Sequence, residues 1–133
     1  MTAVIADTHS VLWYLAADTR LSAGARSALE SATGDGWPIF IPTMCLVEAT
    51  YLAEKARIAG SDLARLSEAL RIEDGALVAQ PLTMDVAVAL RRIPRDQVPD
   101  MPDRVIAATA LALGLPLVTR DGRIRVSGVE TIW

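Results

Sequence analysis

The sequence predicts an α/β protein with a parallel sheet that helices cover on both faces. Three observations indicate this: short apolar runs typical of strands, helical segments that separate them, and capping or breaking residues at the boundaries. Strands that alternate with helices form parallel sheets, because each crossover needs a segment long enough to hold a helix. With 133 residues, 52% of them hydrophobic, residues 1–133 are expected to form a single domain around one core.

The expected strands are apolar runs of three to seven residues, most of them rich in Val, Ile and Leu. A turn at Asp121-Gly122 and a short basic piece separate the last two strands. The expected strands cover residues 3–6, 39–41, 76–82, 115–119 and 129–133.

Capping residues define the first two helices. Asp7 and Thr8 follow the first strand and are suited to starting a helix over residues 8–17. Ser22 caps a second helix, which ends before Gly34. The first quarter of the chain is therefore expected to run strand, helix, helix.

The middle of the chain predicts a hairpin of two helices. A long helix is expected to begin at Pro42 and to reach about Ala59, where Gly60 ends it. Ser61 is expected to cap the second helix, which runs to about Ile72.

Proline residues set the boundaries in the second half. Thr83 caps a helix through Arg92 that Pro94 prevents from continuing, and residues 95–101 are expected to form a loop. Pro102 suits a first helical turn and opens a helix that runs to Leu113.

Composition excludes several classes of protein. The longest apolar stretch, residues 105–118, is broken by Gly114 and Pro116 and is shorter than the roughly 18 residues of a membrane span. Asp7 interrupts the N-terminal apolar run before a signal-peptide core forms, so we expect a cytoplasmic protein with no membrane partner. Cys45 is the only cysteine, which excludes an intramolecular disulfide and predicts a small buried side chain. The net charge of −3 does not by itself indicate nucleic-acid binding.

Carboxylates from four separated segments are the strongest functional signal. In an open parallel sheet, ligands bind beyond the carboxyl ends of the strands. Asp7 and Asp121 follow the first and fourth strands, while Glu48 and Asp103 lie on helices next to that edge. Carboxylates gathered at one site repel one another unless a cation neutralises them, and oxygen-only ligands favour Mg²⁺ or Mn²⁺.

Each acid other than Glu48 also has a purely structural interpretation when viewed alone. Asp7 suits a helix N-cap, Asp103 suits the first turn of a helix, and Asp121 precedes Gly122 in an ordinary turn. Glu48 lies among apolar neighbours without an obvious basic partner in the sequence.

Three segments carry a resemblance to a known family. They read "ADTHSVLWYL", "PTMCLVEATYLAEKARI" and "DMPDRVIAATALALGLPLVTRD", and together they resemble a bacterial PIN domain of the VapC toxin type over essentially the whole chain. The resemblance implies a three-layer α/β/α fold with a five-stranded parallel sheet in the order 3-2-1-4-5. It also implies an acidic site formed by Asp7, Glu48, Asp103 and Asp121, with Thr119 as the Thr or Ser found two residues before the last acid.

The same resemblance implies an activity and partners. The family consists of Mg²⁺- or Mn²⁺-dependent endoribonucleases that leave a 5′-phosphate and a 3′-hydroxyl, with water activated by the metal. We expect Asp7 and Asp103 to bind the metal directly, and Glu48 and Asp121 to complete the pocket directly or through water. The implied partners are an RNA substrate, a cognate antitoxin that occupies the active-site groove, and a second copy that pairs through helices near the N-terminus, within a possible larger toxin–antitoxin assembly.

Further residues are candidates for supporting roles. Asp100 lies close enough in sequence to Asp103 to reach a metal through water, and His9 is a candidate ligand or proton shuttle whose other interpretation is packing. Trp13 and Tyr14 are expected to belong to the core and the dimer surface rather than to stack on bases. Arginines near the site-forming segments are candidates for contacts to the RNA backbone, although a solvated surface explains each singly: Arg91, Arg92, Arg95, Arg104, Arg120, Arg123 and Arg125.

Alternatives to a nuclease remain open. A receiver-like signalling domain also combines a doubly wound sheet with an acidic Mg²⁺ pocket, but the third strand ends without an acid and the only lysine, Lys55, is expected in mid-helix. A haloacid-dehalogenase phosphatase needs a second Asp where His9 stands. A third alternative is a catalytically inactive PIN domain used only for binding.

Overall fold

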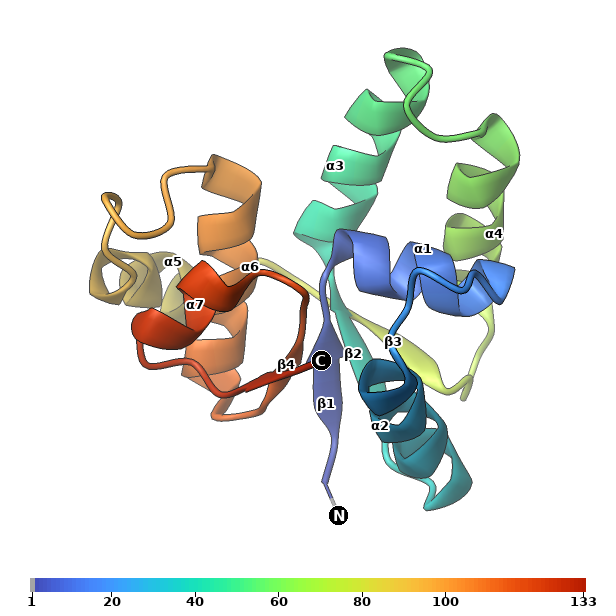
Figure 1. Cartoon of the computed structure of the whole chain (residues 1–133), viewed down its shortest axis with the longest axis horizontal. Helices are drawn as coiled ribbons and strands as arrows, with labels where there is room; N and C mark the ends of the chain where they lie inside the picture. The colour runs from blue at the N-terminus through green and yellow to red at the C-terminus, as the bar shows by residue number, and fades with distance from the viewer. Residues whose placement is uncertain (1) are drawn as a thin grey trace.

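The computed structural model describes residues 2–133 and contains a five-stranded sheet in which every strand pair is parallel. The strand order is β3-β2-β1-β4-β5. Helices lie around this sheet, and β1 runs through its centre (Figure 1). The predicted fold class and strand order are therefore confirmed. The strands are β1 (Val4–Ala6), β2 (Ile39–Pro42), β3 (Leu77–Gln80), β4 (Leu117–Val118) and β5 (Thr131–Ile132).

The helices begin where side chains cap them. Asp7, Ser22 and Thr83 each accept a hydrogen bond from a backbone N–H three residues later, as their residue types predict. The helices are α1 (Thr8–Ala16), α2 (Ala23–Gly34), α3 (Thr43–Glu54), α4 (Gly60–Arg71), α5 (Met84–Ala89), α6 (Met101–Leu113) and α7 (Gly122–Val126), with a 3-10 helix η1 (Leu90–Arg92) after α5.

The helical hairpin differs from the prediction at its connection. Helix α3 ends before the expected residue 59, because the chain leaves it through Ala56, which has a left-handed φ of 56°. Lys55 therefore follows the helix instead of lying within it. Ser61 does not cap α4. The N-cap is Ala59, whose backbone N–H donates to Oδ2 of Asp62 over 3.1 Å.

Three boundaries in the second half also differ from the prediction. The helix expected through Arg92 stops at Ala89 and tightens into η1. Helix α6 begins one residue earlier than expected, because the side chain of Asp100 caps it by accepting from the backbone N–H of Asp103 over 3.2 Å. The basic piece after Asp121 is a short helix, α7, whose first turn that carboxylate caps.

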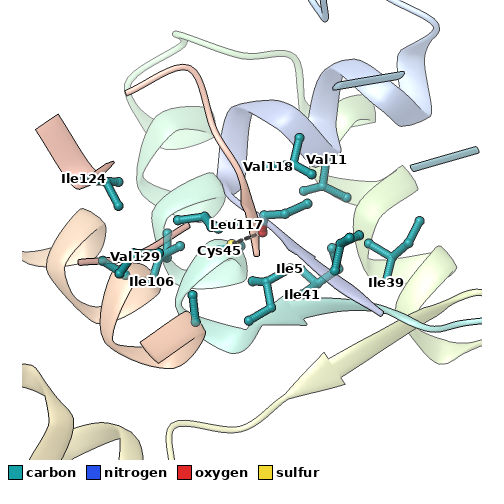
Figure 2. Packing of buried hydrophobic residues seen from close by; sticks show 14 of the residues in the cluster. Ile5, Val11, Ile39, Ile41, Cys45, Ile106, Leu117, Val118, Ile124 and Val129 are labelled. Atoms are coloured by element: carbon teal, nitrogen blue, oxygen red, sulfur yellow. Dashed lines mark hydrogen bonds between the residues drawn. The ribbon is translucent and has the colours of Figure 1, made fainter. Parts of the chain in front are cut away.

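The core lies on the central strands and on the helices that cover them. Figure 2 shows Ile5, Ile41 and Leu117 packed near Cys45, whose Sγ lies 3.8 Å from the carbonyl oxygen of Ala6. Cys45 is fully buried, as the sequence predicts, and burial is the main reason that the pKa of its thiol is raised. Within the described residues, none of the helices has the length and apolar character needed to cross a bilayer.

The sheet register brings separate segments of the chain to one edge. Ala6, the last residue of β1, pairs with Val118, the last residue of β4. The backbone N–H of Asp7 donates to the carbonyl of Val118 over 3.1 Å. Residues that follow β1 and β4 therefore start side by side at the carboxyl edge, where strand order reverses and ligands bind in open α/β sheets.

Candidate functional site

A cleft of 670 Å³ opens at this edge of the sheet, and carboxylates dominate one part of its lining. The structure brings together the four acids singled out in the sequence and adds a fifth. The acids that line the cleft are Asp7, Glu48, Asp100, Asp103 and Asp121. They come from the end of β1, from α3, from the start of α6 and from the residue that precedes α7.

Local hydrogen bonds fix the orientation of these acids. Oδ1 of Asp7 accepts from the backbone N–H of Ser10 over 3.0 Å, so Asp7 is a helix cap and a cleft residue at the same time. The hydroxyl of Thr8, which is buried, donates to Oε1 of Glu48. This partner of Glu48 could not be predicted from the sequence, because 40 positions separate Thr8 from Glu48.

Three of the carboxylates are close enough to share one metal ion. One oxygen from each of Glu48, Asp100 and Asp103 lies within 4.8 Å of the others. Asp100, expected only as a supporting residue, is thus part of the tightest acidic cluster among the described residues. Asp7 lines the same cleft outside this cluster, so its direct coordination of a metal stays a prediction.

Asp103 lies where both burial and neighbouring negative charges oppose ionisation of its carboxyl. Burial is the largest cause that raises the pKa of Asp103 to about 7. The remaining causes are the negative charges of its neighbours, in decreasing order Asp100, Glu48, Asp121 and Asp7. The four other acids of the cleft therefore all act on Asp103, and a bound cation would relieve both this repulsion and the cost of burial.

Asp121 has a different environment from Asp103. Arg123 donates from Nε and Nη2 to its two oxygens over 3.1 and 3.0 Å, and these bonds lower the pKa of Asp121. Thr119, which is 2% exposed, accepts from the backbone N–H of Asp121 over 3.1 Å. Thr119 thus positions the loop that carries Asp121.

Basic and aromatic side chains form another part of the cleft wall. Arg20, Arg57 and Arg120 line the cleft together with Trp13 and the exposed ring of His9. Of these arginines, sequence reasoning found only Arg120. The other two lie in the connections after α1 and α3, and the sequence alone carries a weak signal for them: both connections follow helices that start at the carboxyl edge of the sheet.

The other arginines singled out in the sequence lie elsewhere in the described structure. Arg104 has a structural role: it is half-buried, and its guanidinium donates to the carbonyls of Leu90 and Ile93 over 2.9 to 3.1 Å. Arg123 pairs with Asp121. The remaining candidates are exposed and do not line this cleft: Arg91, Arg92, Arg95 and Arg125.

The aromatic residues of α1 pack in or against the core as predicted, while their place in a dimer surface stays a prediction. Trp13 is 8% exposed, its ring lies 6.1 Å from that of Trp133 and 5.5 Å from that of His9, and it belongs to the core. Tyr14 is half-buried against the same core. His9 therefore makes the packing contact that was its alternative interpretation, while its exposed ring still lines the cleft.

Fold, strand order and acidic cleft together define a class of protein. The family described as PIN domain matches residues 4–128, and the chain belongs to this family. Ribonuclease VapC22 of Mycobacterium tuberculosis is 33% identical over 130 residues, which cover 94% of this chain and 92% of that protein.

Solved structures share the fold at lower identity. VapBC2 from Rickettsia felis, bound to a DNA fragment from its promoter, superposes with a TM-score of 0.71 at 15% identity and covers 98% of this chain and 97% of its own. FitAcB from Neisseria gonorrhoeae superposes with a TM-score of 0.62 at 20% identity and covers 96% and 95%. A toxin–antitoxin complex from Klebsiella pneumoniae gives 0.59 at 24% identity and covers 89% and 86%.

Proposed function

We propose that this protein is a metal-dependent endoribonuclease of the VapC type and the toxin of a toxin–antitoxin pair, with residues 1–133 acting as one PIN domain. The observation that carries the proposal is the gathering of five carboxylates in one cleft at the carboxyl edge of the sheet. Membership of the PIN family and the 33% identity to a ribonuclease support the choice of RNA as substrate.

The residues of the cleft fit a divalent cation. Every donor in the cluster of Glu48, Asp100 and Asp103 is a carboxylate oxygen, which suits the hard ions Mg²⁺ and Mn²⁺. The pKa of Asp103 is raised first by burial and then by the negative charges of the other acids, and a bound cation would offset both. We assign direct ligation to Asp103 and Asp7, with Glu48 and Asp100 completing the set.

Each residue then has a defined task in phosphodiester hydrolysis. The chemistry that the cation supplies is activation of a water for attack on phosphorus and stabilisation of charge on the leaving oxygen. Thr8 holds Glu48 in place, and Thr119 holds the loop that presents Asp121. Arg123 orients Asp121 through hydrogen bonds to both of its oxygens, and these bonds lower the pKa of this carboxyl.

Two protein partners belong to the proposal. Two of the structural relatives are named as VapBC2 and as a toxin–antitoxin complex, which supports a cognate antitoxin for this chain. A homodimer through the helices near the N-terminus, within a larger toxin–antitoxin assembly, remains an expectation from the family.

The test is RNA cleavage by the purified protein and by Asp7→Asn. The amide has nearly the shape of the carboxylate and still caps α1, so the variant should fold but lose cleavage. A panel of structured RNAs is incubated with Mn²⁺, with Mg²⁺ and with EDTA, and products are analysed for 5′-phosphate ends.

The matched control is Asp85→Asn, which makes the same change in the first turn of α5, away from the cleft. We expect metal-dependent cleavage by wild type and by Asp85→Asn, and none by Asp7→Asn, whose melting temperature in EDTA should be no lower than that of wild type. Full cleavage by folded Asp7→Asn, with EDTA still inhibiting wild type, would remove Asp7 from the site.

A further inference from the structure

A second hollow of 280 Å³ adjoins the cleft. Four residues line both spaces, namely His9, Trp13, Arg20 and Arg57. None of the five carboxylates of the cleft lines the second hollow. Its acids are Asp18 and Asp62, each of which already pairs with an arginine.

The arginines that line the cleft and the second hollow differ in whether an acidic side chain pairs with them. Arg20 is held by Asp18 through Nη2 at 2.7 Å, and the two charges largely offset each other. Within residues 2–133, neither Arg57 nor Arg120 makes an ion pair or a side-chain hydrogen bond. Both residues line the cleft, so its wall carries two positive charges that have no ion-pair partner among the described residues.

The ring of Trp13 contacts two of the arginines that line the cleft. The guanidinium carbon of Arg120 lies 5.3 Å from the centre of the Trp13 ring, and that of Arg20 lies 5.1 Å from it. Cation–π contacts of this kind orient a guanidinium without consuming its hydrogen-bond donors. The donors of Arg120 therefore remain available to a ligand.

An unused hydroxyl in the cleft is an independent sign of a ligand. Ser10 is 1% exposed and lines the cleft, yet its Oγ has no hydrogen-bond partner among the described residues. A buried polar group without a partner costs about 1–3 kcal/mol, so such groups commonly serve a ligand or solvent. Ser10 lies on α1 between Asp7 and Trp13 in the chain, next to His9.

We infer that four residues of the cleft, Arg57, Arg120, Ser10 and His9, bind the RNA nucleotide next to the phosphodiester that lies at the carboxylates. These four residues are called the basic arm. The inference rests on the proposed nuclease function and extends it to substrate binding. Arg57 and Arg120 hold the flanking phosphate, and the Ser10 hydroxyl donates to an RNA oxygen. The exposed imidazole of His9 gives the base a flat surface, since bases stack on aromatic side chains.

RNA suits this arm better than an acidic protein segment does. Both would satisfy the two arginines, but a peptide rich in Asp and Glu would also approach the five carboxylates of the adjoining site and be repelled. A phosphodiester chain reaches the carboxylates together with the divalent cation, which offsets the charge there. An acidic segment is the competing occupant in the test.

The test measures RNA binding as a function of salt, with cleavage blocked by Asp103→Asn in every protein compared. The probe is a fluorescein-labelled single-stranded RNA, and fluorescence anisotropy gives Kd over a range of KCl concentrations at fixed Mg²⁺. Each phosphate contact contributes about 0.7 to the slope of log K against log salt for single strands. Arg57→Ala and Arg120→Ala should each lower the slope by about that amount.

Matched variants separate a specific contact from a change in net charge. Arg71→Ala removes the same charge from the far end of α4, at an exposed residue outside both hollows, and should keep the full slope. Arg57→Lys retains the charge and should keep most of the slope. Ser10→Ala removes a hydrogen bond but no charge, so it should weaken binding by about two- to tenfold with the slope unchanged.

Equal slopes and affinities for Arg57→Ala and Arg71→Ala would overturn the inference. So would unchanged RNA binding together with lost binding of a labelled polyglutamate peptide, because the arm would then serve an acidic segment. Failure of the nuclease proposal gives a different pattern: wild type would leave all RNAs intact in Mn²⁺, whatever the arginine variants do to binding.

Discussion

Asp103 is the acid of the cleft whose ionisation is opposed most strongly by burial and by neighbouring negative charges. Its pKa of about 7 in the folded, metal-free protein lies above the value of about 3.9 for an unfolded chain. The folded state therefore holds its proton more tightly. Between these two values the stability of the metal-free protein should fall as pH rises, because unfolding releases the proton.

The variant Asp103→Asn tests this at the same position. In EDTA, wild type should lose more of its melting temperature between pH 5 and pH 8 than Asp103→Asn does, and the variant should be the more stable protein at pH 8. The control Asp85→Asn, an exposed acid outside the cleft, should follow wild type. Parallel pH profiles for wild type and Asp103→Asn would show that the repulsion is absent.

Individual site residues were predictable to different degrees. Asp7 and Asp121 could be placed from the sequence, because each directly follows a strand whose carboxyl end meets the ligand-binding edge. The place of Asp100 in the acidic cluster could not be predicted from the sequence, since its distance from Glu48 depends on how α3 and α6 pack against each other. Arg57 was missed for a similar reason: the shape of the turn after α3 decides that it faces the cleft.

At the scale of elements, Arg104 connects α6 to the end of η1. Its guanidinium spans the carbonyls of Leu90 and Ile93, which lie at the start of η1 and just after it. Arg104→Ala should lower the free energy of unfolding by about 2 kcal/mol, because hydrogen bonds to charged groups contribute about 1.5–3 kcal/mol. Urea denaturation of the two proteins measures the difference.

A second readout separates this structural role from RNA contact. The salt dependence of RNA binding should be the same for Arg104→Ala and for the protein with Arg104, provided both are folded. A reduced slope of log K against log salt, together with unchanged stability, would show that Arg104 contacts RNA.

The presence and type of each helix or strand were easier to predict than the residues at which it begins and ends. Side-chain caps at Asp7, Ser22 and Thr83 mark helix starts in the sequence, because a capping hydrogen bond is local. The predicted end of α3 was wrong because an alanine, Ala56, takes the left-handed conformation that usually indicates glycine. The helix α7 was missed because five residues are too few for a recognisable periodicity.

For the whole molecule, the alternative of a receiver-like domain gives a direct test. A receiver takes a phosphoryl group from a small donor onto an Asp, whereas a metal-dependent nuclease uses water and forms no phospho-enzyme. In the structure β3 ends at Gln80 without an acid, and Lys55 is outside the cleft lining. Intact-mass measurement after incubation with Mg²⁺ and acetyl phosphate should show no mass gain.

A stoichiometric, acid-labile gain of one phosphoryl group would contradict the nuclease assignment. Its loss in Asp7→Asn or Asp121→Asn would place the phosphorylated residue in the cleft. The wild-type protein in EDTA is the control, because phosphoryl transfer in a receiver requires the divalent cation.

The overall fold was predictable in class, and its strand order only through resemblance. Alternating strands and helices lead to a parallel α/β sheet by general rules. The order β3-β2-β1-β4-β5 depends on pairings such as Ile5 with Leu117, which lie far apart in the chain and leave no local pattern. The last two strands are shorter than predicted because only two residue pairs join β4 to β5.

The central claim is that the gathered carboxylates form a divalent-cation site, and the melting temperature in Mn²⁺ tests it most directly. A ligand that binds only the folded state stabilises it by about 2.7 kcal/mol at one hundred times Kd. Wild type and Asp85→Asn should gain the same increment in melting temperature on addition of Mn²⁺, and Asp103→Asn should gain much less. Equal increments in all three proteins would mean that Asp103 is not a ligand, and would contradict the metal site proposed for this cleft.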